Sequence, residues 1–150
     1  MNNTTINSNS NDIKEMEKLF PRAPLKIIAM EGCKELGQKV NDYIVNFRQS
    51  SYREELKSPM YATYLQDNYL VDAHCPRFGS GEAKGVLNES VRGKDLFIMT
   101  DVCNYSLTYS VKGYVNHMSP DDHYQDLKRL ISAANGKEHR LNIIMPFLYE

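Results

Sequence analysis

The stretch from Arg77 to Thr100 constrains the fold of this chain most. A short glycine-rich loop, Phe-Gly-Ser-Gly, is followed by a polar turn and then by the apolar run Leu96–Met99. This run is too apolar for a half-exposed strand, so it predicts a strand in the buried middle of a parallel sheet. Loops that carry Ser, Arg and backbone N–H groups between strands are natural phosphate-binding elements. The stretch therefore favours an α/β fold with a local anion-binding loop.

The segment before this stretch predicts the opening of a β-α-β unit. Leu25–Met30 is a short apolar run after a proline, which indicates a strand, and Glu31 and Gly32 form a turn. A helix is predicted from Cys33 to Arg48, because apolar residues recur there at spacings of four, four and three and so share one face: Leu36, Val40, Ile44 and Phe47. A strand, a glycine turn and an amphipathic helix in series are typical of α/β folds.

A second helix has clear end signals. Ser119 can accept from the free N–H groups of the first turn, Pro120 suits that turn, and Asp121 and Asp122 complement its positive end. The helix is predicted to end at Asn135-Gly136, a left-handed stop, and to bury one stripe: Leu127, Leu130, Ile131 and Ala134.

The remaining segments complete a mainly parallel, twisted sheet flanked by helices. Alternation of apolar and polar residues from Tyr105 to Val111 favours a small hairpin with Lys112-Gly113 at its turn. The other strands are predicted at Tyr69–Ala73, Glu82–Leu87, Asp95–Thr100 and Leu141–Phe147.

The chain has 150 residues, which suits one compact domain with a core. Residues 1–20 are interpreted as a disordered tail rich in Asn, Ser and Thr, followed by a short helix at 13–20. Residues 21–150 form the α/β domain. It contains a surface insertion at 49–67, with one helical turn near 52–57, and irregular material at 104–118.

The composition excludes several function classes. The formal net charge of −1 gives no general attraction to nucleic acid or to an anionic membrane, so we predict neither as a partner. No apolar run approaches the ~20 residues of a membrane span, and the start of the chain does not resemble a signal peptide. Three cysteines without a CxxC pair indicate reduced thiols in a cytoplasmic protein. The four histidines show no metal-ligand spacing, so no metal site is predicted.

Several segments together resemble one family, the ribose-phosphate pyrophosphokinases (phosphoribosyl-pyrophosphate synthetases). The resemblance covers roughly residues 25–48 and 69–150, and its most specific part is Val-Arg-Gly-Lys-Asp with the apolar strand behind it. The matching segments are residues 26–40, Arg-Phe-Gly-Ser-Gly-Glu at 77–82, Asn-Glu-Ser-Val-Arg-Gly-Lys-Asp at 88–95, residues 126–134 and residues 141–147.

The resemblance implies the amino-terminal lobe of a phosphoribosyltransferase-like α/β fold. Such enzymes transfer the β,γ-diphosphoryl group of ATP to the 1-hydroxyl of ribose 5-phosphate with Mg²⁺, and they assemble as homo-oligomers, dimers or hexamers. It further implies that Phe78 stacks on the adenine of ATP bound to a neighbouring subunit. Glu82 would accept from the exocyclic amine or hold the loop. Ser80 stands where many members have Asp, and a hydroxyl replaces one hydrogen bond but not a charge.

The resemblance also assigns a regulatory site. Ser90 and Arg92 match positions that bind phosphate or the β-phosphate of ADP between subunits, and a planar guanidinium beside a turn hydroxyl suits an anion. Simpler readings remain open at this point. Phe78 can be a core residue at a strand end, and Arg92 can cap a turn or pair with Asp95.

No catalytic residue and no metal ligand of the family is assigned to these 150 positions. They contain no acidic glycine-rich loop of the kind that holds ribose 5-phosphate, and phosphoryl transfer depends on positioning and charge neutralisation. We therefore expect the amino-terminal part or a truncated product of a longer synthetase, inactive alone and holding neither Mg²⁺ nor ATP by itself. The alternatives are a non-catalytic regulatory or scaffold subunit and an unrelated α/β nucleotide-binding module.

Overall fold

The computed structural model describes residues 22–50 and 63–149, so the predicted tail at 1–20 and the helical turn at 52–57 lie outside the described residues. At its centre is a three-stranded parallel sheet in the order β1-β4-β7. The strands are β1 (Leu25–Ala29), β4 (Asp95–Met99) and β7 (Arg140–Ile144), and Ile28, Ile98 and Ile143 are in register across them. The predicted buried strand is therefore the central one, and the α/β prediction is confirmed.

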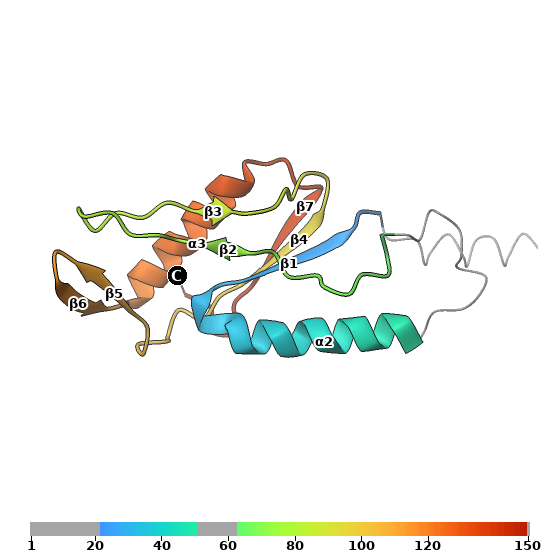
Figure 1. The fold of residues 1–150 in the computed structure, drawn as a ribbon, viewed down its shortest axis with the longest axis horizontal. Coiled ribbons are helices and arrows are strands. Elements are labelled where there is room, and N and C mark those ends of the chain that lie inside the picture. Colours follow the sequence, from blue (N-terminus) through green and yellow to red (C-terminus); the bar gives the residue numbers. More distant parts are fainter. Residues whose placement is uncertain (1–21, 51–62, 150) are drawn as a thin grey trace, which may run out of the picture.

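Two helices cover opposite faces of this sheet (Figure 1). After the 3₁₀ turn η1 (Glu31–Cys33), helix α2 (Lys34–Ser50) packs on one face, and α3 (Pro120–Ala134) packs on the other. Alternate residues of each strand point to the two faces, as the pleat requires. On the α3 side they meet Leu127, Leu130 and Ala134, and on the α2 side they meet Val40, Ile44 and Val45.

Helix α2 does not bury the face that its apolar spacing predicts. Val40 and Ile44 reach the core, but Leu36 is 46% exposed and Phe47 is 55% exposed. The reason is a close approach of helix and strand at Gly37, where an added Cβ would stand only 2.4 Å from the Cβ of Ala29. The helix therefore turns its smallest residue to β1, and the apolar stripe is rotated partly into solvent.

Helix α3 begins and ends as predicted. The Ser119 side chain accepts from the Asp122 N–H, and the Asp122 carboxylate accepts from the Ser119 N–H, which together make a capping box. Asn135 closes the helix in the left-handed conformation with φ 59°.

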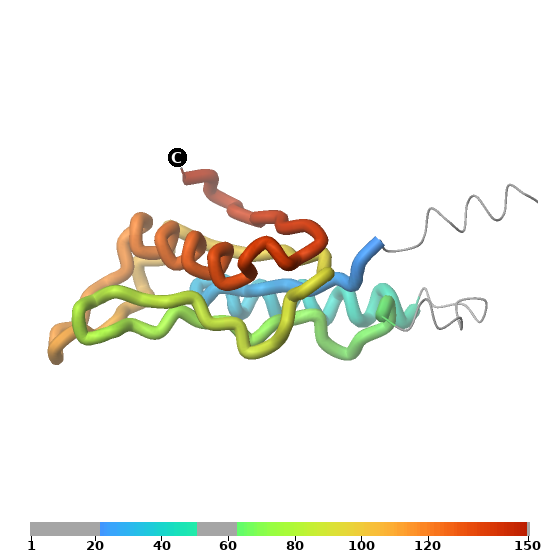
Figure 2. The backbone as a smooth tube through the Cα atoms, turned by 90° about the horizontal axis from the view of Figure 1, so that it is seen from above, coloured from blue at the N-terminus to red at the C-terminus, as the bar shows by residue number. Residues whose placement is uncertain are grey.

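Two antiparallel ribbons project from the carboxyl side of the sheet (Figure 2). The β2–β3 ribbon pairs β2 (Ala73–His74) with β3 (Val86–Leu87), and an isolated bridge joins Arg77 to Ala83 further along. The predicted third strand, Glu82–Leu87, is thus regular only at its end. On the opposite side Pro76 has no N–H to donate, and its carbonyl accepts from the Lys84 N–H at 3.4 Å.

The other predicted strands differ in detail. At Tyr69–Ala73 the chain runs beside β1 through one parallel bridge, Ile27 to Leu70, and then enters β2. The predicted hairpin is confirmed as β5 (Thr108–Val111) and β6 (Tyr114–His117), with Lys112 and Gly113 at positive φ in its two-residue turn. The last strand ends at Ile144 rather than Phe147.

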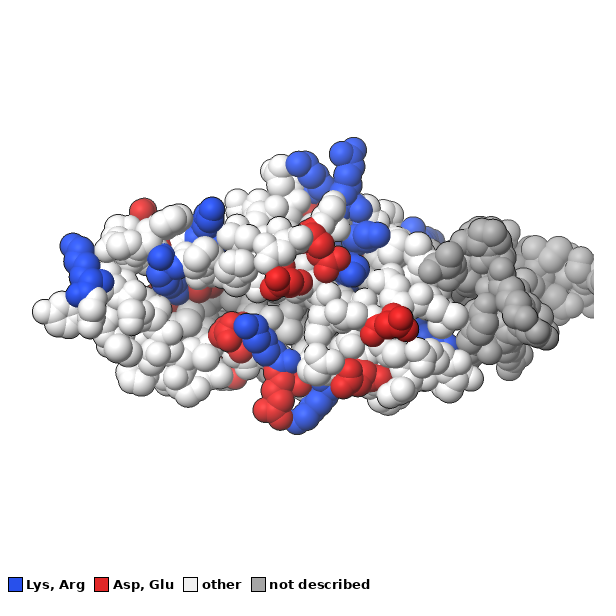
Figure 3. Space-filling view, in the orientation of Figure 1, with Lys and Arg blue, Asp and Glu red and all other residues white. Residues whose placement is uncertain are grey.

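The surface carries no dominant charge on the side drawn in Figure 3, where acidic and basic side chains are interspersed over the central part. This distribution agrees with the near-zero net charge. Over the ranges 22–50 and 63–149, no helix has the length and apolar character that crossing a bilayer requires.

A candidate functional site on the β2–β3 ribbon

The tip of the β2–β3 ribbon is a tight loop that gathers Phe78, Ser80 and Glu82. We call residues 78–82 the contact loop. The Phe78 N–H donates to the Glu82 carbonyl at 2.7 Å, and the Gly81 N–H donates to the Phe78 carbonyl at 2.9 Å. Gly81 has φ 95°, a conformation that favours glycine, so the residue type at this position is tied to the turn.

The three predicted side chains point outward from this loop rather than into the core. Phe78 is 49% exposed, and Ser80 and Glu82 are also exposed. The Ser80 hydroxyl donates to the Glu82 carboxylate at 3.3 Å. The reading of Phe78 as a core residue is therefore wrong, because the loop projects beyond the packed layers and offers an aromatic face and a carboxylate to solvent.

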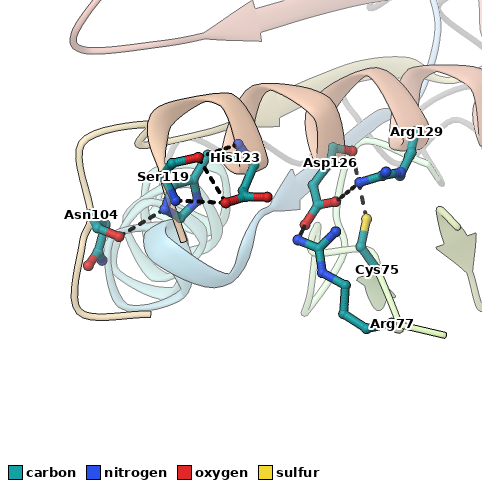
Figure 4. Close-up of polar contacts among 8 residues, drawn as sticks. Cys75, Arg77, Asn104, Ser119, His123, Asp126 and Arg129 are labelled. Carbon is teal, nitrogen blue, oxygen red and sulfur yellow. Dashed lines mark hydrogen bonds and ion pairs between the residues drawn. The ribbon is translucent and has the colours of Figure 1, made fainter. Parts of the chain in front are cut away.

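The residue before the contact loop is fixed by a buried ion pair (Figure 4). The Arg77 guanidinium donates to one Asp126 oxygen at 2.8 Å, and Arg129 donates to the other at 2.5 Å. The Arg77 and Asp126 side chains are 10% and 8% exposed. Removing one member of such a buried pair leaves an uncompensated charge, which costs about 3–5 kcal/mol.

Burial also shifts the titration of groups around this ion pair. It raises the pKa of the Asp126 carboxyl, although the hydrogen bond from Arg129 and the charge of Arg77 act in the opposite direction. Burial and then the Asp126 charge raise the pKa of the Cys75 thiol to about 11. Cys75 is therefore a thiol at neutral pH and donates weakly to the Asp126 carbonyl at 3.7 Å, so it lacks the thiolate that a nucleophile needs.

The second predicted site lies at the opposite end of the ribbon, in the turn that leads into β4 (Figure 1). Three residues of this turn are anchored: Asn88 donates to the Asp72 carboxylate at 2.7 Å, Glu89 pairs with Lys26 at 3.0 Å, and Val91 is buried. Ser90 and Arg92 lie on either side of Val91 and are exposed, and the Arg92 N–H donates to the Ser90 hydroxyl at 3.3 Å. The motif thus separates into residues that hold the turn and two that face outward.

The structure decides one open reading of Arg92. Asp95 is bound by Arg140, which donates to its two carboxylate oxygens at 2.9 and 2.6 Å, and by Asn142. These contacts hold the pKa of the Asp95 carboxyl below its usual range. In the part of the chain that the structure describes, the Arg92 side chain has no ion pair, so the predicted alternative of a pair with Asp95 is wrong.

The histidines serve the fold where their contacts are described. His123 is buried on α3, and its Nε2 lies 2.8 Å from the Asn104 carbonyl, while His117 Nδ1 lies 2.9 Å from the Tyr105 carbonyl. Across residues 22–50 and 63–149, no three His, Cys, Asp or Glu side chains are grouped in a way that could hold a metal ion.

Sequence reasoning missed the Arg77–Asp126–Arg129 cluster. A signal was present, because Asp126 lies directly beside Leu127 on the face of α3 that the apolar stripe buries. A carboxylate on such a face requires a cationic partner. What the sequence does not supply is the identity of that partner, because Arg77 lies 49 residues away.

The parallel sheet, its two covering helices and the projecting ribbon define a phosphoribosyltransferase-like α/β domain. The family model for the N-terminal domain of ribose phosphate pyrophosphokinase matches residues 25–150, and the chain belongs to this family. A comparison with curated proteins gave no match.

Proposed function

We propose that this chain is the amino-terminal part of a ribose-phosphate pyrophosphokinase, which transfers diphosphate from ATP to ribose 5-phosphate to make phosphoribosyl pyrophosphate for nucleotide biosynthesis. One observation carries the proposal: in a chain of this family, the predicted base-contacting residues Phe78 and Glu82 stand exposed on a projecting, anchored loop.

The contact loop has the chemistry that an adenine requires. The exposed ring of Phe78 offers a face for stacking, an interaction of about 1–3 kcal/mol for a base on an aromatic side chain. The Glu82 carboxylate accepts hydrogen bonds only, which suits an exocyclic amine. Ser80 donates to Glu82 and so orients this acceptor. The resemblance to the family implies that this base belongs to ATP bound in a neighbouring subunit of a homo-oligomer, and the exposure of the projecting loop supports that assignment.

The turn at residues 88–95 is proposed as the regulatory anion site. Ser90 and Arg92 are exposed neighbours, and they combine a hydroxyl with a guanidinium that has no ion pair among the described residues. Inorganic phosphate and the β-phosphate of ADP both present oxygens that such donors recognise. The two proposed sites lie at opposite ends of one ribbon, so each can be tested without altering the other.

Catalysis itself is proposed to need groups that these 150 residues do not supply. Mg²⁺ neutralises phosphate charge when bound to the intact enzyme, and we assign no residue of this chain to hold it. We propose that the isolated chain makes no phosphoribosyl pyrophosphate, and that the intact enzyme acts as a dimer or hexamer in the cytoplasm, where its thiols stay reduced. Product formed by the purified chain from ATP, Mg²⁺ and ribose 5-phosphate would disprove the proposed inactivity.

The loop assignment is tested by NMR titration of the isotope-labelled chain with ATP and, separately, with GTP. ATP in large excess should contact the loop of the isolated chain through its base alone, without the firm hold of the intact oligomer. We therefore expect small shifts of the amide signals of residues 78–82, and we expect Phe78→Ala to weaken this contact by roughly 5- to 150-fold, the equivalent of 1–3 kcal/mol. Tyr114→Ala is the matched control, because Tyr114 is an aromatic residue of the neighbouring hairpin and is 76% exposed. Equal ATP binding by wild type and Phe78→Ala would overturn the base-contact role.

The anion assignment is tested in the same sample with inorganic phosphate. We expect shifts at the Ser90 and Arg92 amides that Arg92→Ala abolishes and that Phe78→Ala leaves unchanged. Phosphate shifts that persist in Arg92→Ala would remove Arg92 from the proposed site.

A further inference from the structure

The β5–β6 hairpin lies beside the contact loop, at the same end of the molecule (Figures 1 and 2). Two contacts connect them. The Arg77 guanidinium lies over the Tyr109 ring, with its central carbon 4.5 Å from the ring centroid. A methyl group placed on Gly81 would stand 3.8 Å from a Val111 methyl carbon. Strand β5 therefore approaches both the base of the contact loop and its turn.

The sequence of β5 is arranged for this contact. Its residues alternate in burial: Thr108 and Ser110 are exposed, whereas Tyr109 and Val111 are partly covered. A strand presents alternate residues to one face, so the covered pair forms the side that meets the ribbon. Three of the four residues of β6 are exposed.

Arg77 lies where the ribbon narrows into the contact loop, in the bridge opposite Ala83. Its guanidinium is planar, so its edge can donate to Asp126 while its face meets the Tyr109 ring. A cation on an aromatic face is attracted more strongly when both are shielded from water, and the Arg77 side chain is largely buried. The two contacts thus hold one side chain between helix α3 and the hairpin.

The contact loop has little else to hold it. Within it we find two backbone hydrogen bonds, from Phe78 and from Gly81, and two longer contacts of the Ser80 hydroxyl, with the Glu82 carboxylate at 3.3 Å and the Glu82 N–H at 3.4 Å; its predicted binding residues are exposed. Segments with few buried contacts open locally at low free-energy cost. The order of this loop therefore depends on the groups that fix its base.

We propose that Arg77 and Tyr109 are positioning residues, and that the β5–β6 hairpin, through Tyr109, sets how well the contact loop is ordered. Arg77 carries this effect because it is the side chain that touches α3, the hairpin and the loop base together. What the ordered loop binds rests on the proposed function, but the coupling between hairpin and loop does not.

Amide hydrogen exchange, measured by NMR on the whole chain, tests this coupling. The probes are the Phe78 and Gly81 N–H groups, which are bonded within the loop. We expect Tyr109→Leu to speed exchange at both probes by roughly 3- to 30-fold, the range that corresponds to a cation–π contact. Tyr109→Phe retains the ring and should stay within about two-fold of wild type.

Two controls separate the coupling from general destabilisation. Tyr114→Leu alters the same hairpin at an exposed side chain and should leave both probes unchanged. Amides of the central strand β4 should also exchange at wild-type rates in Tyr109→Leu. Unchanged exchange at Phe78 and Gly81 in Tyr109→Leu would overturn the proposal, and so would an equal acceleration at the probes and in β4.

The exchange experiment and the ATP titration can fail independently, so failure of the coupling can be told apart from failure of the proposed function. If Tyr109→Leu loosens the loop but ATP shifts no loop signal even in wild type, the coupling stands and the base-contact role fails. If ATP shifts the loop signals but amide exchange at Phe78 and Gly81 is unchanged in Tyr109→Leu, the base-contact role stands and the coupling fails. If both hold, Tyr109→Leu should also weaken ATP binding, while Tyr109→Phe should not.

Discussion

At Gly85 the β2–β3 ribbon packs directly against the backbone of helix α3, and Gly85→Ala tests whether this close contact fixes the ribbon. A Cβ at this position would stand 2.4 Å from the Arg129 carbonyl oxygen and 2.7 Å from its carbon. Carbon atoms in ordinary contact are about 3.5–4.0 Å apart, so the ribbon would have to withdraw by about 1 Å. The obstructing atoms belong to the helix backbone, so no side-chain rotation relieves the clash.

The expected magnitude follows from two opposed effects. Adding a methyl group to a well-packed site costs about 1–3 kcal/mol. Replacing glycine by alanine also restricts the unfolded chain, which stabilises a protein by about 0.4–1 kcal/mol where the native backbone accepts the change. We therefore expect Gly85→Ala to lower the free energy of unfolding by a net amount of roughly 0–2.6 kcal/mol.

Gly79→Ala is the matched control on the same ribbon. Gly79 has no atom within 4 Å of an added Cβ and does not adopt a positive φ. Gly79→Ala should therefore only restrict the unfolded chain, which should raise the free energy of unfolding by about 0.4–1 kcal/mol. The difference between the two variants cancels that effect and isolates the steric cost, about 1–3 kcal/mol.

Urea unfolding followed by circular dichroism measures this difference. The m-values of the two variants should agree, which would confirm that both expose the same surface area on unfolding. In thermal unfolding, each kcal/mol should move the midpoint by about 2–4 °C. If Gly85→Ala proves as stable as Gly79→Ala, the ribbon does not rest on the backbone of α3, and the reasoning fails.

Two further predictions concern polar contacts of the sheet. Asn41→Leu removes the side-chain oxygen that accepts from the buried Tyr69 N–H at 2.8 Å, so it should lower the free energy of unfolding by about 1–3 kcal/mol. Asn46→Leu, at an exposed position of the same helix, should change the free energy of unfolding by less than about 0.5 kcal/mol, and equal effects of the two variants in urea unfolding would contradict this account. Arg140→Ala should raise the pKa of the Asp95 carboxyl in an NMR titration, because the Arg140 hydrogen bonds hold that pKa down. Since the pKa of Asp95 is depressed in the folded state, the stabilisation by Arg140 is present above the unfolded-state pKa of about 3.9 and is lost as pH falls through the folded-state pKa. The free energies of unfolding of wild type and Arg140→Ala should therefore converge in acid, and a difference that stays constant with pH would contradict this prediction.

The elements that sequence reasoning predicted well are those whose signals are local. The apolar run of β4 and the end signals of α3 act within a few residues, so they give the same structure in almost any α/β context. The buried face of α2 was not predictable in this way. It depends on Gly37 meeting Ala29, a contact between two elements that no periodicity within the helix reports.

The candidate site likewise has a part that is encoded locally in the sequence and a part that depends on the fold. The motif at 88–95 and the loop at 77–82 could be identified because their residues are contiguous and resemble a known family. The support beneath the loop could not, since Asp126 and Tyr109 come from segments far along the chain from Arg77. Only the fold brings these side chains together.

Exposure alone does not single out Phe78, because Tyr43 and Tyr114 are more exposed than it is. What distinguishes Phe78 is the support on either side of it. Arg77 precedes it in a buried ion pair, and Gly85 follows it against the backbone of α3. A phenyl ring left half in water forgoes part of the ~1.5–3 kcal/mol that full burial would contribute. A ribbon fixed by polar and backbone contacts can hold such a ring outward without a core of its own, and this arrangement suits the proposed contact with a base on a neighbouring molecule.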